Sequence, residues 1–482
     1  MLRFELNGSP VEVDRVSPNH TLLDWLRAEG HTGTKEGCAE GDCGACTVVF
    51  LDDRAPGGPR YRAINSCLVL LPMMNGRSLW TVEGIGSVAD PHPVQAAMVE
   101  ELGSQCGFCT PGFVMSLFEA CYRDDLDDDW KLDDQLAGNL CRCTGYRPIR
   151  DAANQVAGRC PKDGFQHALT RPPTVATGLD HSHDGERFVA PTTLAAATRL
   201  LAELPDARVV CGATDLGLDV TKRHARFPLL LSTEHIGELQ GIEEDDGGWS
   251  IGASVTLTDL EDWSADALPM LHRMLRYFGA RQIKHRATLG GNLCNASPIG
   301  DLAPALLALD ASVVVAGEEG RRRVPLSEFF LAYRSTALGA GELLARVDIP
   351  RPKPGTRSGA YKVSRRRELD ISAVSAGMVL EFDGDFISAA RLGFGGMAAT
   401  PSRAPQTEAA LVGQPWNQQT AKAAAELLAE DFTPIDDHRG SAWFRQTLAR
   451  NLLLGFATET ADASFVALPT GHTGTILPGS AR

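Results

Sequence analysis

The sequence has 482 residues, of which 43% are hydrophobic and 22% are charged, and its formal net charge at pH 7 is −15. Such a chain is too long for one hydrophobic core, and its composition is that of an ordinary globular protein with roughly three or four domains. The acidic balance argues against a nucleic-acid partner, and no apolar run of about 18 residues offers a helix that could span a membrane.

The first residues, 1–13, alternate apolar and polar side chains and predict a strand. They lack the basic start and apolar core of a signal peptide, so the predicted location is the cytoplasm. Disulfides are uncommon in that compartment, yet ten of the twelve cysteines fall between Cys38 and Cys160. The spacing of these cysteines therefore needs another explanation.

The first cysteine group lies between a predicted helix over 21–30 and a predicted strand over 46–53. Its members are Cys38, Cys43, Cys46 and Cys67. Four residues separate the first two and two residues separate the next two, which is the plant-type ferredoxin spacing of a [2Fe–2S] cluster. Zinc ligands usually come as two close pairs, so the iron–sulfur interpretation is favoured over zinc or loose thiols.

Glycines make this loop possible. Three thiolates can converge from one loop only if the backbone curls tightly, and Gly37, Gly41 and Gly44 allow positive φ without a steric penalty. Their amides can also point at the cluster sulfurs. The flanking helix and strand predict a β-grasp sheet with a helix across it.

A second group follows, with its members in two close pairs: Cys106, Cys109, Cys141 and Cys143. Thr110 and Pro111 predict that a helix begins just after Cys109, and Pro148 lies near the start of another. Helix N-termini favour an anionic thiolate cluster, although two close pairs also suit a zinc ion. Cys121 and Cys160 are interpreted as core or surface thiols.

Two glycine-containing segments later in the chain could hold a phosphate-bearing cofactor. One is 209–218, where a turn follows a strand, and the other is 278–306, with paired glycines at Gly290 and Gly291 followed by Asn292. Glycine pairs let the backbone approach a pyrophosphate, but such turns also simply connect strands. Between them and beyond, apolar runs alternate with helical stretches, as in α+β proteins.

The last third predicts strands over 372–382 and 386–394, followed by helices around 408–411 and 420–430. Residues 161–187 are rich in proline, glycine and charge and predict a linker. Three histidines in that stretch, at 167, 181 and 183, are not favoured as metal ligands. The end of the chain, from 466 to 482, predicts a disordered tail.

The strings QCGFCTPG and LCRCTGYRPI, together with the first cysteine loop, resemble the iron–sulfur half of the molybdenum hydroxylases, the family of xanthine dehydrogenase and aldehyde oxidase. The resemblance implies a second [2Fe–2S] cluster rather than zinc, and it places Gln105 against the pterin of a molybdenum cofactor. One departure is ELGS upstream of Gln105, where the family more often has HGS.

The glycine segments and the C-terminal third resemble the FAD-binding half of the same family. By position, the resemblance assigns the following residues to the flavin: Val209, Val210, Cys211, Gly212, Ala213, Thr214, Asp215, Leu216, Gly217, Phe278, Thr288, Leu289, Gly290, Gly291, Asn292, Asp301, Leu344 and Lys362. Tyr333 matches the position beside the flavin where a nicotinamide would stack.

The FAD-binding half has two further features: a departure from the family pattern at Ala213 and a run of basic residues. Ala213 departs from the usual Gly or Asn and would strain the loop by about 1 kcal/mol if it needs positive φ. The basic run from Arg365 to Arg367 is either a solvated face or an aid to admitting an anionic dinucleotide.

The predicted fold class is α+β multidomain: a β-grasp ferredoxin domain, a helical [2Fe–2S] domain, a two-part α+β FAD-binding domain and an α+β C-terminal domain. The predicted boundaries are 1–85 for the ferredoxin domain, 86–162 for the helical domain, 163–187 for the linker, 188–358 for the FAD domain, 359–465 for the C-terminal domain and 466–482 for the tail.

The resemblance implies the small subunit of a bacterial two-subunit xanthine dehydrogenase, without catalytic residues for the molybdenum chemistry. Electrons would pass from molybdopterin on a large partner subunit through two [2Fe–2S] clusters to FAD and then NAD⁺, in a heterotetramer of two small and two large subunits. Alternatives remain open: an aldehyde or N-heterocycle hydroxylase, O₂ as final acceptor, or a stand-alone flavo-ferredoxin.

Overall fold

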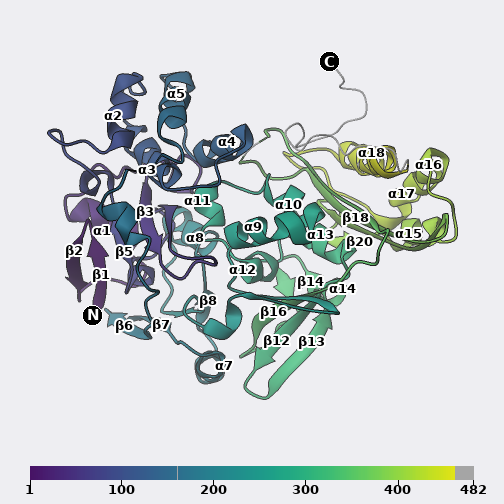
Figure 1. Ribbon diagram of the computed structural model, residues 1–482. Helices are drawn as coiled ribbons and strands as arrows, with labels where there is room; N and C mark the ends of the chain where they lie inside the picture. Colours follow the sequence, from purple (N-terminus) through teal and green to yellow (C-terminus); the bar gives the residue numbers. More distant parts are fainter. Residues whose placement is uncertain (160, 368, 462–482) are drawn as a thin grey trace. The chain divides into compact units, whose positions relative to one another are not determined.

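The computed structural model describes residues 1–159, 161–367 and 369–461. Cys160 and the predicted tail 466–482 lie outside the described residues. The chain divides into two compact units. The first contains 1–237, 256–259 and 279–288, and the second contains 238–255, 260–278 and the residues from 289 onward. The predicted α+β multidomain fold is confirmed (Figure 1). The division into units cuts across the predicted FAD domain, which has a part in each unit.

The first unit opens with a five-stranded mixed sheet of order β2-β1-β5-β3-β4. Its strands are β1 (Leu2–Leu6), β2 (Ser9–Val13), β3 (Thr47–Asp52), β4 (Arg60–Asn65) and β5 (Ser78–Trp80), with short helices η1 (Leu71–Met74) and η2 (Val82–Gly84). Only β1 and β5 run parallel, with Glu5 opposite Ser78. Helix α1 (Leu22–Ala28) begins after Thr21, whose side chain accepts a hydrogen bond from the amide of Asp24, and packs its apolar face on the sheet. The predicted sheet with a helix across it is confirmed.

The helical module consists of α2 (Pro93–Glu100), α3 (Thr110–Cys121), α4 (Asp129–Ala137) and α5 (Arg147–Val156). Residues 112–121 of α3 are all buried, so α3 is the central helix of this module and packs on β3 (Figure 1). The predicted helix starts after Cys109 and near Pro148 are confirmed.

The rest of the first unit carries a four-stranded sheet of order β6-β7-β9-β8. Its elements are α6 (Gly164–Ala168), β6 (Leu179–His183), β7 (Glu186–Ala190), α7 (Leu194–Glu203), β8 (Arg208–Val210), α8 (Leu216–Arg223), β9 (Leu229–Ser232) and η3 (Gly237–Leu239), the last of which begins at the end of this unit. The 163–187 segment, predicted as a linker, thus holds a short helix and a strand. His181 is buried there with its Nε2 2.8 Å from the carbonyl oxygen of Val16, a structural role rather than a ligand role.

The second unit contains an antiparallel sheet of order β10-β11-β16-β12-β13 and a small hairpin, β14-β15. The elements in this part of the chain, some of which contribute residues to the first unit, are β10 (Ile242–Asp245), β11 (Gly248–Gly252), α9 (Leu257–Ala267), α10 (Pro269–Leu275), α11 (Arg281–Lys284), α12 (Leu289–Cys294), α13 (Leu302–Ala308), β12 (Ser312–Gly317), β13 (Gly320–Pro325), α14 (Leu326–Phe329), β14 (Phe330–Ala332), β15 (Ser335–Thr336) and β16 (Leu343–Pro350). Of these, α11 belongs to the first unit, and α9 crosses the division.

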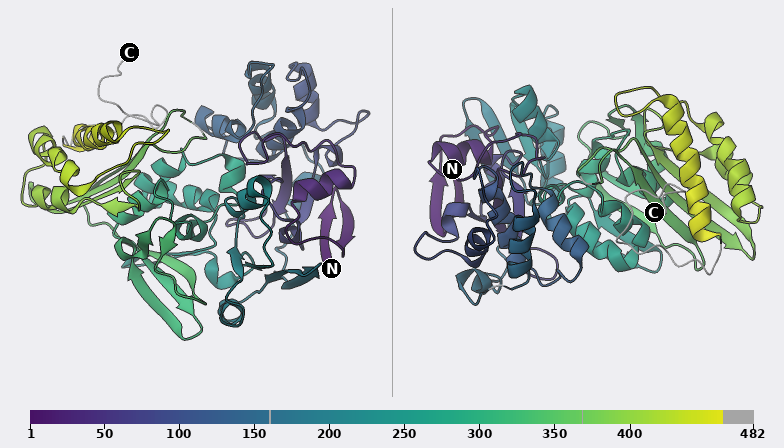
Figure 2. Two further views of the ribbon diagram at one scale, coloured as in Figure 1. Left: turned by 180° about the vertical axis from the view of Figure 1, so that it is seen from behind. Right: turned by 90° about the horizontal axis from the view of Figure 1, so that it is seen from above.

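An antiparallel four-stranded sheet completes the second unit. Its elements are β17 (Arg357–Val363), β18 (Val374–Asp383), β19 (Phe386–Gly395), β20 (Ser402–Arg403), α15 (Pro405–Leu411), α16 (Gln418–Glu426), α17 (Leu428–Asp431) and α18 (Ala442–Thr460). Helices α16 and α18 lie side by side on this sheet and share its hydrophobic core (Figure 2). α13 also packs on the sheet, at glycines: a Cβ at Gly377 would come within 2.5 Å of the Cα of Ala305. The predicted C-terminal strands and helices are confirmed.

Candidate functional site: two cysteine quartets and the flavin segments

The loop between α1 and β3 holds three of the predicted cluster ligands. Gly41 and Gly44 have φ of +82° and +67°, and a Cβ at Gly37 would lie 2.7 Å from the sulfur of Cys43. The backbone amides of Glu40 and Cys43 donate to Cys38 Sγ at 3.4 and 3.3 Å. The glycine requirement read from the sequence is thus met by positive φ at two positions and by a close approach at the third.

The four thiols of this quartet meet as two pairs, Cys38 with Cys43 and Cys46 with Cys67. Cys46 and Cys67 are buried and packed with Leu23 and Leu68, so one side of the site is dry. In the part of the chain that the structure describes, no three His, Cys, Asp or Glu side chains form a group suited to one metal ion. The structure thus brings the four thiols together in space, as the predicted [2Fe–2S] ligation requires.

The second quartet also pairs, Cys106 with Cys143 and Cys109 with Cys141. Burial acts to raise the pKa of Cys141, but the hydroxyl and amide of Thr144 and the amide of Cys143 hydrogen bond to its sulfur and lower that pKa to about 7. Donors aimed at a sulfur stabilise a thiolate, as cluster ligation requires.

The two ligand loops are joined directly. The amide of Leu140 donates to the carbonyl oxygen of Cys43 at 2.9 Å, and the side chain of Asn139 donates to the carbonyl oxygen of Gly44 at 3.0 Å. A Cβ at Gly112, in the first turn of α3, would come within 2.2 Å of that same Gly44 oxygen. Sequence reasoning missed Asn139 and Leu140, and the only available signal was their place just before Cys141.

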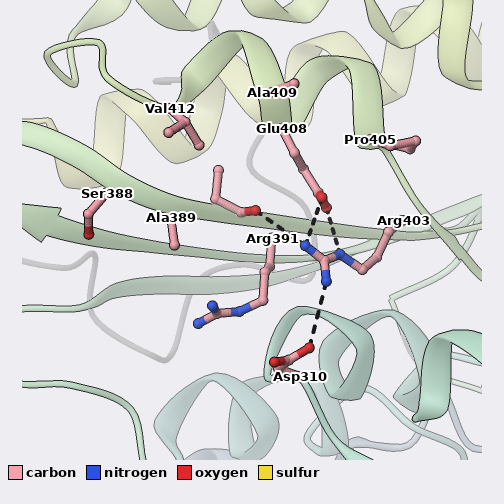
Figure 3. Close-up of a pocket in the computed structure, with 10 residues that line it drawn as sticks. Asp310, Ser388, Ala389, Arg391, Arg403, Pro405, Glu408, Ala409 and Val412 are labelled. Atoms are coloured by element: carbon pink, nitrogen blue, oxygen red, sulfur yellow. Dashed lines mark hydrogen bonds and ion pairs between the residues drawn. The ribbon is translucent and has the colours of Figure 1, made fainter.

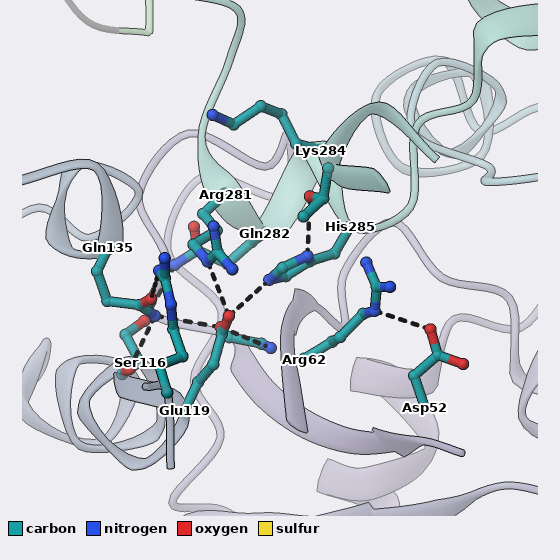
Figure 4. A network of polar contacts seen from close by, with 12 residues as sticks. Asp52, Arg62, Ser116, Glu119, Gln135, Arg281, Gln282, Lys284 and His285 are labelled. Atoms are coloured by element: carbon teal, nitrogen blue, oxygen red, sulfur yellow. Dashed lines mark hydrogen bonds and ion pairs between the residues drawn. The ribbon is translucent and has the colours of Figure 1, made fainter. Parts of the chain in front are cut away.

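A buried polar network in the first unit joins α3, α4 and α11 (Figure 4). Glu119 of α3 accepts hydrogen bonds from Arg281 Nε and His285 Nε2, both at 2.8 Å. Lys284 pairs with Asp134 of α4 at 3.1 Å, so ion pairs of Arg281 and Lys284 join α11 to the helical module. Burial lowers the pKa of His285 to about 4 although the Glu119 carboxylate opposes the shift, so this imidazole is neutral near pH 7.

Several residues that lie near the second quartet in the sequence have exposed side chains. Cys106 and Cys143 are exposed, as is the predicted pterin contact Gln105. The large apolar side chains exposed close to these cysteines in the sequence are Val99, Leu102, Phe108, Leu140 and Tyr146, called here the second-quartet face.

The flavin segment of the first unit, 209–217, turns tightly before α8. Ala213 has φ of +64°, which confirms that this departure falls at a position of positive φ. Gly212 is fixed by close approach, because a Cβ there would lie 1.7 Å from the carbonyl oxygen of Arg286. Thr288, the other predicted flavin contact in this unit, is buried. Tight turns with small residues fit a pyrophosphate-bearing group such as FAD.

In the second unit, Gly290 is held against Ala253, whose backbone a Cβ would meet at 2.8 Å, while Asn292 is half-buried. Asp301 and Lys362 form a buried ion pair of 2.8 Å, and Ser372 donates to the other oxygen of Asp301. The Lys362 ammonium also donates to the carbonyl oxygen of Tyr277 at 2.9 Å. Two of the predicted flavin contacts thus bind each other.

The remaining predicted flavin contacts differ in exposure. Phe278 is half-buried, Leu344 is buried and Tyr333, in the turn after β14, is 63% exposed. In the basic run, Arg365 donates to the carbonyl oxygen of His438, and Arg366 donates to that of Leu369 at 2.7 Å. Arg365 and Arg366 therefore use some of their N–H groups in hydrogen bonds to backbone carbonyls. Their part in admitting a dinucleotide stays a prediction.

A shallow cavity of about 480 Å³ lies in the second unit, between Asp310, the start of β19 and α15 (Figure 3). Arg403 pairs there with Glu408 at 2.7 Å, and Arg391 donates to the carbonyl oxygen of Ala308 at 2.9 Å and pairs with Glu381. Because both guanidinium groups are already engaged by acceptors of this chain, the cavity has little to offer an anion.

Family models match four successive parts of the chain. They describe a 2Fe-2S iron-sulfur cluster binding domain at 4–71, a [2Fe-2S] binding domain at 81–154, an FAD binding domain in molybdopterin dehydrogenase at 183–352, and a CO dehydrogenase flavoprotein C-terminal domain at 359–460. CO dehydrogenase from Oligotropha carboxidovorans, a solved structure, is 30% identical with a TM-score of 0.53, and the match covers 55% of this chain and 94% of that one.

The chain belongs to the molybdenum hydroxylase family. Quinoline 2-oxidoreductase from Pseudomonas putida 86 is also 30% identical, with a TM-score of 0.53 over 56% of this chain and 95% of that one. Xanthine dehydrogenase of Emericella nidulans is 33% identical over 94% of this chain, and xanthine dehydrogenase/oxidase of Rattus norvegicus is 32% identical over 94%. This member of the family spans about two fifths of the length of those curated relatives.

This molybdenum hydroxylase chain is therefore an oxidoreductase component with two [2Fe–2S] domains and an FAD-binding domain. Among the helices that the structure describes, none combines the length and the apolar character needed to cross a bilayer.

Proposed function

We propose that this chain is the electron-transfer subunit of a xanthine dehydrogenase, which oxidises hypoxanthine and xanthine to urate with NAD⁺ as acceptor. The single observation that carries the electron-transfer part of this proposal is the hydrogen bond from Leu140 to Cys43, because it joins the loops of two cysteine quartets that differ in exposure. The quartet with exposed cysteines is the electron entry, and the quartet with two buried cysteines is the inner station.

The eight cysteines hold the clusters, and the residues around them set their surroundings. When bound, the clusters supply one-electron transfer and FAD couples two such transfers to one hydride. The amides of Glu40 and Cys43 and the hydroxyl of Thr144 direct hydrogen bonds at ligand sulfurs, while Leu23 and Leu68 exclude water from the inner quartet. Gly212, Gly290 and Asn292 are proposed to hold the flavin.

The second-quartet face is proposed to bind a large subunit that carries molybdopterin, with Gln105 against the pterin. We infer a heterotetramer of two small and two large subunits in the cytoplasm, where thiols stay reduced. The xanthine assignment follows the curated relatives. Their names are xanthine dehydrogenase and xanthine dehydrogenase/oxidase, and each match covers nearly the whole of this chain.

The experiment is anaerobic turnover of the native complex with xanthine, with urate and NADH measured together. The proposal expects one NADH for each urate formed, and bleaching of iron–sulfur and flavin absorbance when NAD⁺ is withheld. Turnover of an aldehyde or of quinoline in place of xanthine would assign a sister activity. Peroxide in place of NADH when the assay is repeated in air would assign O₂ as acceptor, and purification without a large subunit would point to a stand-alone carrier.

A further inference from the structure

The last turn of α8 holds the loop that carries Cys38. The Lys222 ammonium donates to the carbonyl oxygen of Cys38 and pairs with the Glu40 carboxylate at 3.4 Å. The neighbouring Thr221 donates its hydroxyl to the carbonyl oxygen of Ala39 at 2.8 Å. Two consecutive helix residues thus contact three consecutive residues of the ligand loop.

The loop has a conformation that needs such support. Ala39 has φ of +53°, in the left-handed region that a residue with a Cβ disfavours. This turn is what brings the amide of Glu40 to within 3.4 Å of Cys38 Sγ. Helix α8 holds the carbonyl groups of Cys38 and Ala39. It thereby keeps Cys38 Sγ within hydrogen-bond distance of the backbone amides that donate to it.

Lys222 also places a positive charge beside the first quartet. One-electron reduction of a cluster adds one negative charge, which a nearby cation stabilises and a nearby carboxylate opposes. The Lys222 and Glu40 side chains are 43% and 45% exposed, so solvent screens both effects. The Lys222 charge and the Glu40 charge should therefore act on the potential in opposite directions.

We propose that Lys222 is a positioning residue that raises the reduction potential of the first-quartet cluster, and that the Glu40 carboxylate lowers the same potential. This inference rests on the proposed role of that cluster as an electron carrier. Because α8 begins at Leu216, within the predicted flavin segment 209–217, one helix links the cluster loop to that segment.

The test is a redox titration of the purified complex in which the two [2Fe–2S] signals are followed by EPR. A Cys43→Ser variant first assigns the first-quartet signal, because it should lose only that one. Lys222→Met should make the assigned cluster harder to reduce by two- to tenfold, at most about 59 mV lower, and leave the second-quartet potential unchanged. Glu40→Gln should shift the same cluster in the opposite direction.

Matched variants keep the test independent of folding and of turnover. Arg223→Gln removes the same charge one residue along α8, but that side chain is 68% exposed and pairs with Asp219, so the potential should not move. Lys222→Arg should restore the native value. Unchanged potentials in Lys222→Met, or shifts of equal sign in Lys222→Met and Glu40→Gln, would overturn the proposal.

Two further outcomes also decide the question. If Lys222→Met lost its cluster, Glu40→Gln would decide, since an unshifted potential there overturns the inference. A complex that proved inactive on xanthine would leave these potentials measurable, so failure of the proposed substrate and failure of this inference are distinguishable.

Discussion

At the scale of single residues, Ala213 holds a conformation that its side chain disfavours. Its φ of +64° lies in the left-handed region, and the residue is buried in the turn before α8. Ala213→Gly should therefore raise the free energy of unfolding by up to about 1 kcal/mol, seen as a higher melting temperature. Ala197→Gly, in the interior of α7, is the control and should lower it. Equal losses in both variants would contradict the strain.

The flavin contacts can be tested at Asn292, which is half-buried in α12. Asn292→Ala should lower the ratio of FAD to iron in the purified protein, while Asn295→Ala, one turn along the chain, should leave it unchanged. Flavin content equal to the native value in Asn292→Ala would count against its assignment.

A substitution at Asp301 is a less specific test of the flavin site than one at Asn292. Asp301→Asn would leave the buried Lys362 ammonium without its charged partner, and breaking a buried ion pair typically costs about 3–5 kcal/mol. Flavin loss in that variant would therefore follow from destabilisation as readily as from a lost contact.

At the scale of elements, α11 and His285 make the first unit sensitive to acid. The pKa of His285 is about 4 in the folded chain because burial disfavours its charged form, whereas an unfolded histidine titrates near 6.5. Between these values the unfolded chain binds more protons, so this residue lowers the free energy of unfolding as pH falls from about 6.5 to 4. The slope is at most about 1.4 kcal/mol per pH unit.

His285→Gln should flatten the dependence of the melting temperature on pH across that window. The exposed His438→Gln is the matched control and should keep the native slope. An unchanged slope in His285→Gln would show that other groups carry the acid sensitivity.

At the scale of the whole molecule, the second-quartet face is the surface on which the proposed molybdenum subunit should dock. Val99 is 75% exposed in the last turn of α2, and Val99→Arg should abolish copurification with the molybdenum subunit by placing a charge in an apolar interface. Iron and FAD content should stay at native levels, because Val99 lies outside both cofactor segments. Val175→Arg, at another exposed valine of the first unit, should leave copurification intact. Retained copurification in Val99→Arg would move the docking site elsewhere.

The two cysteine quartets could be predicted from the sequence because their information is local. Cys38, Cys43 and Cys46 share one loop, glycine spacing dictates how that loop can curl, and Pro111 marks where α3 starts. Strands such as β18 and β19 were readable for the same reason, since a short turn joins two apolar runs.

Contacts between distant segments left no such local pattern. The bond from Leu140 to Cys43, the pairing of Asp301 with Lys362, and the hold of Lys222 on the Cys38 loop each join residues far apart in the chain. No periodicity or spacing encodes which surfaces will meet, because that depends on how several elements pack at once. The sequence by itself thus determined the cysteine quartets and the order of the modules. Only the tertiary structure decided how the two loops touch and which charges lie beside them, since burial and pairing exist only after the chain has folded.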